Sequence, residues 1–208
     1  AYKQSSERKS FHNASLSFRD FLAGLDLKIE ISPLVPHQIP RVAELTQRTN
    51  QFNFTTQRRS ESDIQRLYQG RAAECLIVNL RDRFGDYGLV GVIIFTAVDG
   101  IFVDTFLLSC RALGKGVEHR LLARLGEIAM QRGLSRVEVR YLQSKKNRPA
   151  LEFLELVGAD LKETIDGGFL FRFPAEYAAA IEYWPPDTAA TSTASAEDEG
   201  PSVISPDS

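Results

Sequence analysis

Cysteine is scarce in this sequence: Cys75 and Cys110 are the two cysteines in 208 residues. Two cysteines are too few for a disulfide framework, and the residues around them lack the paired spacing of a zinc site. We therefore expect free thiols, no bound metal and a reducing cytoplasm.

Long apolar runs and an excess of one charge are also missing. The sequence has no apolar stretch of the roughly 18 residues that a membrane helix needs, and no signal-peptide-like start. Its 25 basic and 27 acidic residues give a net charge of -2. Without an overall cationic field, we expect neither nucleic acid nor a membrane as a partner.

The two ends of the chain differ in composition from the middle. Residues 1–13 are polar and basic, and residues 15–25 have the apolar spacing of a short helix. We interpret residues 1–25 as a linker and an N-terminal helix from a preceding domain. Residues 185–208 are rich in Pro, Ala, Ser, Thr, Asp and Glu, which predicts a disordered acidic linker. The folded domain is expected over residues 26–184.

Within that domain, apolar periodicity predicts an alternation of strands and helices. Strands are expected at residues 26–32, 75–80, 89–96, 101–108, 137–142, 161–164 and 169–173, and helices at 37–49, 60–70, 117–131 and 146–156. The second to fourth strands follow one another closely, the first two joined by a polar loop over residues 81–88, so they should form an antiparallel meander. This order predicts an α+β fold with a mixed, mostly antiparallel central sheet of about seven strands and about four helices.

A glycine-containing turn joins the strand at 101–108 to the longest helix. It reads Arg111-Ala-Leu-Gly114-Lys115-Gly116. Two glycines one residue apart allow the backbone to approach a ligand, and the free amides of the first helical turn favour an anionic group such as a pyrophosphate. The turn is therefore a candidate phosphate site.

Arg111-x-x-Gly114-x-Gly116 fits the Gln/Arg-x-x-Gly-x-Gly/Ala signature of the GNAT acyltransferases, whose loop holds the pyrophosphate of coenzyme A or a related phosphopantetheine donor. Together with residues 50–55, 82–91 and 104–116, it makes the chain resemble the C-terminal GNAT-like domain of FkbH-like proteins, from about Leu27 to Gly158. Those proteins also carry a HAD-type phosphatase domain. They load a glyceryl unit from 1,3-bisphosphoglycerate onto an acyl carrier protein in polyketide and tetronate pathways.

The resemblance implies a GNAT fold whose fourth and fifth strands separate beside the glycine loop and admit a pantetheine arm. It implies coenzyme A or the phosphopantetheine of an acyl carrier protein as cofactor, and as partners that carrier protein and a HAD-type phosphatase domain, on the same chain or in trans. Phe52 and Phe54 either line this groove or fill the core. Asn147, three residues before Ala150, would hold the pantetheine amides. The donor is expected to contact Leu108, Arg111, Leu113, Gly114, Lys115, Gly116, Val117 and Asn147.

Three residues are candidates for catalysis. Cys110 precedes the loop near a helix N-terminus and could act as a nucleophile, or it could simply pack there. Asp104 lies in an apolar strand, where a charge needs a partner or a function. Leu154 occupies the place of the Tyr that serves as acid in the family, and leucine cannot donate a proton. His119, together with Tyr141, is the nearest substitute.

Three functions remain open from the sequence. The first is an acyltransferase that passes a glyceryl or similar small acyl group to a carrier protein through Cys110. The second is a non-catalytic module that binds phosphopantetheine or the carrier protein, which the missing Tyr favours. The third is a coenzyme A-dependent N-acetyltransferase.

Overall fold

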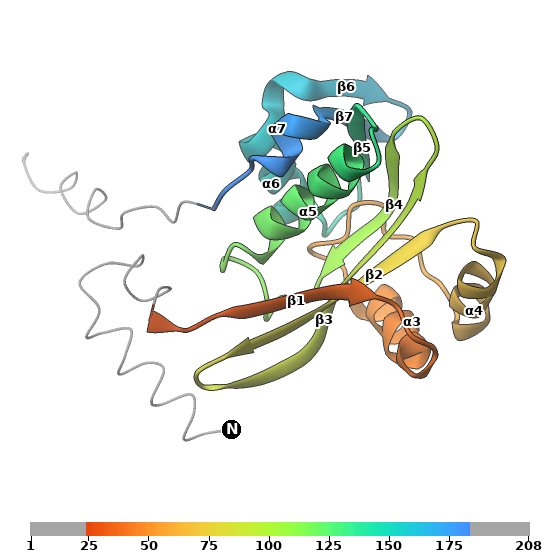
Figure 1. The fold of residues 1–208 in the computed structure, drawn as a ribbon, viewed down its shortest axis with the longest axis vertical. Helices are drawn as coiled ribbons and strands as arrows, with labels where there is room; N and C mark the ends of the chain where they lie inside the picture. The colour runs from red at the N-terminus through yellow and green to blue at the C-terminus, as the bar shows by residue number, and fades with distance from the viewer. Residues whose placement is uncertain (1–23, 184–208) are drawn as a thin grey trace, which may run out of the picture.

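A seven-stranded sheet with the order β1-β2-β3-β4-β5-β7-β6 runs through the computed structural model of the chain, which describes residues 24–183 (Figure 1). Strands β4 and β5 pair in parallel, and the other neighbours pair antiparallel. The strands are β1 (Lys28–Pro33), β2 (Glu74–Asp82), β3 (Gly85–Ala97), β4 (Ile101–Leu108), β5 (Arg136–Leu142), β6 (Lys162–Ile165) and β7 (Gly168–Pro174).

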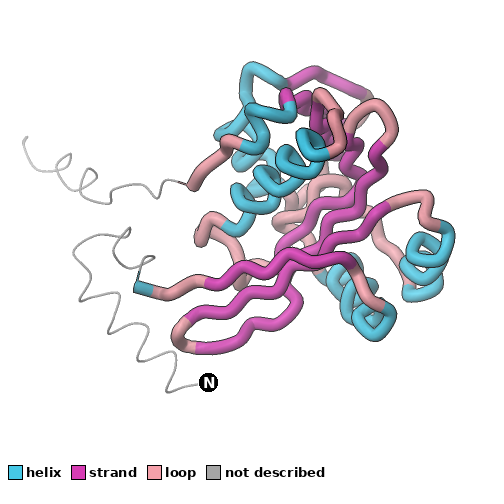
Figure 2. Tube along the Cα trace, in the orientation of Figure 1, coloured by secondary structure: helices cyan, strands magenta, loops and turns pink. Residues whose placement is uncertain are grey.

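Helices cover both faces of this sheet (Figure 2). On one face, a core cluster joins the helices α3 (Ile39–Arg48) and α4 (Glu61–Gly70) to sheet side chains such as Val92 and Leu107. On the other face, a second cluster joins the helices α5 (Val117–Gln131) and α6 (Arg148–Gly158) to sheet side chains such as Ile93 and Phe106. The helical elements are η1 (Pro36–Gln38), α3 (Ile39–Arg48), α4 (Glu61–Gly70), α5 (Val117–Gln131), α6 (Arg148–Gly158), η2 (Ala159–Leu161) and α7 (Ala175–Ala179). The predicted α+β class and mixed sheet are confirmed.

The sheet divides between β4 and β5. Their pairing covers three residues of each strand and ends at Val103 opposite Val139. On the other side of β4, Phe95 lies opposite Val103 and Ile94 lies opposite Thr105, so Asp104 is an extra residue on β4. An extra residue of this kind is a β-bulge, which bends the strand that carries it. The expected separation of the fourth and fifth strands is therefore present, and it starts at Asp104.

Residues 52–55 lie in the gap between the two strands, and we call them the inserted segment. The amide of Phe54 donates to the carbonyl of Phe106 (3.0 Å), and the amide of Leu108 donates to the carbonyl of Phe52 (2.9 Å). From the other side, the amide of Leu142 donates to the carbonyl of Phe54 (2.8 Å). Both aromatic side chains of the segment are buried, and the ring of Phe54 stacks on Phe106 at 4.5 Å. Phe52 and Phe54 therefore belong to the core, and the inserted segment fills the gap that was expected to admit a pantetheine arm, because its backbone takes up the hydrogen bonds of both strands.

Two local expectations differ from the structure. The loop expected over residues 81–88 is a tight hairpin, because Asp82 accepts hydrogen bonds from the amides of Phe84 (2.9 Å) and Gly85 (3.1 Å) and lets both strands extend. Helix α7 was not expected. It packs on α5 at Gly126, where an added Cβ would lie 2.2 Å from the backbone nitrogen of Ala179. The linkers expected over residues 1–25 and 185–208 lie outside the described residues, apart from residues 24 and 25.

Candidate active site

The glycine loop has a backbone conformation that favours glycine at two positions. Gly114 (φ 71°) and Gly116 (φ 79°) are both left-handed, and Gly116 is the N-cap of α5. Helix α5 then buries Val117 in the core. Of the other residues expected to contact a donor, Arg111 is exposed and Leu113 is half-buried. The loop therefore has the shape of an anion site at a helix N-terminus.

Tyr183 covers one end of this loop. Its hydroxyl donates to the carbonyl of Gly114 (3.1 Å), and a Cβ added to Gly116 would lie 2.5 Å from the tyrosine ring. Gly116 is thus required both for its positive φ and for the close approach of the ring. The ring of Tyr183 therefore lies directly against the Gly116 end of the loop.

Lys115, which was expected to contact a donor at the loop, points toward the hairpin between β2 and β3. The Nζ atom of Lys115 lies 3.8 Å from a carboxylate oxygen of the buried Asp82 and 4.3 Å above the ring of Tyr87. Tyr87 in turn donates its hydroxyl hydrogen bond to Asp82 (2.8 Å). Lys115 therefore ties the loop to the hairpin between β2 and β3.

A buried acid and a buried imidazole follow the loop. Glu118 and His119 are each 7% exposed, and their side chains approach to 3.8 Å. Burial raises the pKa of Glu118, although the backbone amides of Glu118 and Gly114 act in the opposite direction. Burial lowers the pKa of His119, and the imidazole packs edge-on against Phe153 at 5.0 Å. His119 is therefore neutral at pH 7. Sequence reasoning missed Glu118, because an acid in a first helical turn is normally solvated.

Cys110 lies at the mouth of an open cleft of about 730 Å³. The thiol is exposed, just after the end of β4, and Lys146 stands in the same lining. Among the residues that the structure describes, Lys146 has no ion-pair partner. The remaining lining residues include Leu108, Ser109, Phe52 and three charged residues of α3, namely Arg41, Glu44 and Arg48. A thiol in this position is accessible to a substrate of moderate size.

The other cysteine is different in kind. Cys75 is half-buried in β2, and burial raises the pKa of its thiol to about 12. A thiol with so high a pKa is almost entirely protonated at neutral pH, so it is a poor nucleophile. This agrees with the core role that its position at the start of a strand suggests.

Asn147 is fully buried and joins three parts of the chain. Its side-chain oxygen accepts from the hydroxyl of Tyr141 (2.9 Å) and the amide of Ser144 (2.8 Å). Its side-chain nitrogen donates to the carbonyls of Asn53 (3.0 Å) and Leu142 (2.9 Å). These four bonds fill the capacity of one amide group. To hold pantetheine, Asn147 would have to exchange some of them.

Asp104 has a charged partner, as expected for an acidic residue in an apolar strand. It forms an ion pair with Arg59 and accepts a hydrogen bond from the Thr105 hydroxyl (3.0 Å). However, about 13 Å of strand separates Asp104 from Leu108 at the thiol cleft. Asp104 lines another groove, and His119 is buried beneath Tyr183. The structure thus does not bring Cys110, Asp104 and His119 together.

Comparison with known proteins identifies the architecture. By sequence, the chain matches no family model and no curated protein. By structure, it is similar to the paia N-acetyltransferase of Thermoplasma acidophilum in complex with coenzyme A, with TM-score 0.54 and 14% identity over 71% of this chain and 99% of that one. A domain from Methanocaldococcus jannaschii gives TM-score 0.56 and 14% identity over 72% and 99%. A chimera of the spermidine N-acetyltransferase SpeG from Vibrio cholerae and hSSAT gives 0.52 and 13% over 73% and 98%.

The chain has the GNAT fold. In the GNAT fold seen here, the separated strands β4 and β5, the glycine loop and the cleft at Cys110 occur at one end of the sheet. Leu154, which replaces the expected tyrosine acid, is completely buried. Within residues 24–183, no helix is long and apolar enough to cross a membrane, and no group of His, Cys, Asp and Glu side chains could hold a metal ion.

The glycine loop fits a pyrophosphate in part. Gly114 is exposed and carries the required left-handed backbone, whereas Gly116 lies under Tyr183. The side of α5 facing the loop also contains the buried carboxyl group of Glu118, which disfavours a nearby anion when it is ionised. A donor that bound at this loop would have to share it with Tyr183 and would be favoured by a protonated Glu118.

Proposed function

We propose that this chain is an acyltransferase domain of the GNAT fold that passes a glyceryl or similar small acyl group onto the phosphopantetheine thiol of an acyl carrier protein. The observation that carries the proposal is the exposed thiol of Cys110. It stands in an open cleft directly before the glycine loop, at the end of β4. The resemblance to FkbH-like proteins supports the choice of acyl group and acceptor.

The chemistry is two successive acyl transfers. First, the Cys110 thiolate attacks the acyl carbonyl of a donor, a carbon–sulfur bond forms, and the bond to the donor's leaving group breaks with its electron pair. Second, the deprotonated thiol of the carrier's pantetheine arm attacks the Cys110 thioester, and Cys110 leaves again as a thiolate. With 1,3-bisphosphoglycerate as donor the first leaving group is phosphate, and the second step exchanges one thiolate for another with no net uptake of a proton, so the route does not need the tyrosine that Leu154 replaces.

The carrier's arm would be held by the glycine loop and by the end of β4. The amides near Gly114 and Gly116 suit its phosphate, while Leu108 and Cys110 border the cleft that would take its thiol end. Coenzyme A carries the same pantetheine chain and is expected to bind in the same way. The proposed order of binding begins with displacement of Tyr183 from Gly116.

The carrier protein itself would dock at the mouth of the cleft. Lys146 lines the cleft, and the neighbouring Lys145 and Arg148 are exposed just before and at the start of α6. Carrier proteins are usually acidic, and a small basic patch would steer one toward the thiol. A HAD-type phosphatase domain, on the same chain or in trans, completes the proposed assembly.

A non-catalytic carrier-binding module is the second candidate. The missing tyrosine favours it, because the buried Leu154 at that position cannot donate a proton. A coenzyme A-dependent N-acetyltransferase has the support of the similar solved structures by fold alone. The buried Leu154 at the position of the expected acid argues against it.

Intact-protein mass spectrometry tests the proposal. The chain is incubated with 1,3-bisphosphoglycerate, the HAD-type phosphatase domain and the acyl carrier protein. We expect a glyceryl adduct on the wild-type chain and on Cys75→Ala, and none on Cys110→Ala, which should also stop loading of the carrier. If Cys110→Ala loads the carrier undiminished and no adduct forms, the chain is a binding module.

A further inference from the structure

A second groove, of about 570 Å³, opens on the sheet face that carries α3 and α4. It lies between α4 and the strands β4, β5 and β7, and none of the residues that border the Cys110 cleft lines it. Most of its wall is apolar, formed by Leu67, Ala72, Ala73, Ile94, Phe102, Val103, Ile165 and Leu170. This volume is typical of a site for a small organic ligand.

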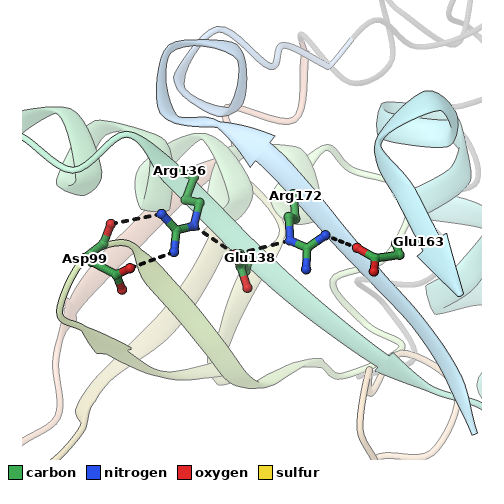
Figure 3. A network of polar contacts seen from close by, with 5 residues as sticks. All are labelled: Asp99, Arg136, Glu138, Glu163 and Arg172. Atoms are coloured by element: carbon green, nitrogen blue, oxygen red, sulfur yellow. Dashed lines mark hydrogen bonds and ion pairs between the residues drawn. The ribbon is translucent and has the colours of Figure 1, made fainter. Parts of the chain in front are cut away.

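The acid of β5 in this groove is already neutralised. Figure 3 shows Glu138 between two arginines, at 2.8 Å from Arg136 and 3.4 Å from Arg172. Arg136 also pairs with Asp99 (2.9 Å), and Arg172 pairs with Glu163. The five charged residues thus alternate in sign from Asp99, in the turn between β3 and β4, to Glu163 on β6, and each of them is paired.

Two positively charged side chains of the groove have donors without acceptors. Arg140 follows Glu138 on the same face of β5, is exposed, and has no carboxylate partner within residues 24–183. Arg59 binds Asp104, but its buried Nε atom has no hydrogen-bond partner in the part of the chain described. An unpaired buried donor costs free energy unless a ligand or water satisfies it.

We propose that this groove binds a small ligand with an apolar body and a single carboxylate group, which Arg140 holds. A guanidinium group binds a carboxylate through two parallel hydrogen bonds, and the apolar wall takes the rest of the ligand. Asp104 and Glu138 are already paired with arginines, so among the lining residues Arg140 is left to neutralise a ligand; its single charge matches a carboxylate and not a doubly charged phosphate ester. The site does not depend on acyl transfer at Cys110.

Binding of model ligands to the full chain tests the site. Isothermal titration calorimetry, with ¹⁵N chemical shifts to locate the site, compares hexanoate and 3-phenylpropanoate with hexanamide, 3-phenylpropanamide and 3-phenylpropyl phosphate. We expect each carboxylate to bind at least about tenfold more tightly than its amide and than the phosphate ester. Arg140→Gln should remove this preference. The control Arg120→Gln, an exposed arginine on α5 outside the groove, should retain it.

A second variant separates the apolar wall from the charge. Phe102→Ser should weaken the carboxylate and its amide by a similar factor and leave their ratio unchanged, because Phe102 belongs to the wall. Equal binding of carboxylate and amide, a preference that survives Arg140→Gln, tighter binding of the phosphate ester, or no binding of any probe would each overturn the proposal. Acyl transfer is not measured, so these outcomes are independent of the function proposed for Cys110.

Discussion

Removal of the Tyr183 side chain should raise the affinity of the chain for coenzyme A by about 30-fold. The hydroxyl of Tyr183 donates to the carbonyl of Gly114 at 3.1 Å, and its ring lies against Gly116. A neutral hydrogen bond contributes about 1 kcal/mol, and partial burial of an aromatic ring contributes about 1 kcal/mol more. Displacing the side chain then costs about 2 kcal/mol, and each 1.4 kcal/mol corresponds to about a tenfold change in the dissociation constant.

Calorimetric titration of coenzyme A into the wild-type chain and into Tyr183→Ala measures this difference. Tyr183→Phe, which keeps the ring and loses the hydroxyl, should gain about fivefold. Tyr177→Ala is the matched control, because Tyr177 lies in α7 and donates its hydroxyl hydrogen bond to Val157 (2.8 Å), away from the loop. An unchanged or weaker affinity in Tyr183→Ala would refute the reasoning, since the ring would then be no obstacle to the donor.

Three further predictions concern the two cysteine thiols, the buried side-chain amide of Asn147 and the buried carboxyl group of Glu118. Iodoacetamide at pH 8 should label Cys110 alone, because a pKa of about 12 leaves roughly 10⁻⁴ of Cys75 ionised; a second adduct in the mass spectrum would contradict this. Asn147→Ala should lower the free energy of unfolding in urea by about 3 kcal/mol, because buried partners lose their hydrogen bonds; a loss below about 1 kcal/mol would show that water replaces them. Glu118→Gln should stabilise the chain by about 1 kcal/mol at pH 8, or about 2–4 °C in Tm. The folded pKa of Glu118 is raised, so the wild type loses stability as the pH rises from about 4.5 through that pKa, and calorimetry should show no gain for the variant at pH 4.

Local sequence signals predicted most of the fold. An apolar run placed β4 at its observed limits, and the helix expected over residues 60–70 is α4, which begins with a capping box between Ser60 and Asp63. The glycines at 114 and 116 also marked the turn between β4 and α5. These features depend on neighbours in the chain, which a sequence displays directly.

Features that depend on distant contacts were not predicted in the same way. Tyr183 reaches the loop from the far end of the domain, and the inserted segment bonds to strands some 50 and 90 residues further along the chain. The burial of Glu118 follows from the packing of α5 in the folded domain. Sequence spacing identified Asp104 as a charge in need of a partner, but only the three-dimensional arrangement shows that the partner is Arg59.

The inserted segment bridges the two parts of the sheet. Only three residue pairs join β4 directly to β5. Beyond them, the two parts of the sheet, β1-β2-β3-β4 and β5-β7-β6, are connected by backbone hydrogen bonds to and from Phe52 and Phe54. Any change that breaks these hydrogen bonds should let the β5-β7-β6 part of the sheet rotate about the three residue pairs between β4 and β5. The width of the thiol cleft and the mechanical integrity of the domain are therefore set by the same few residues.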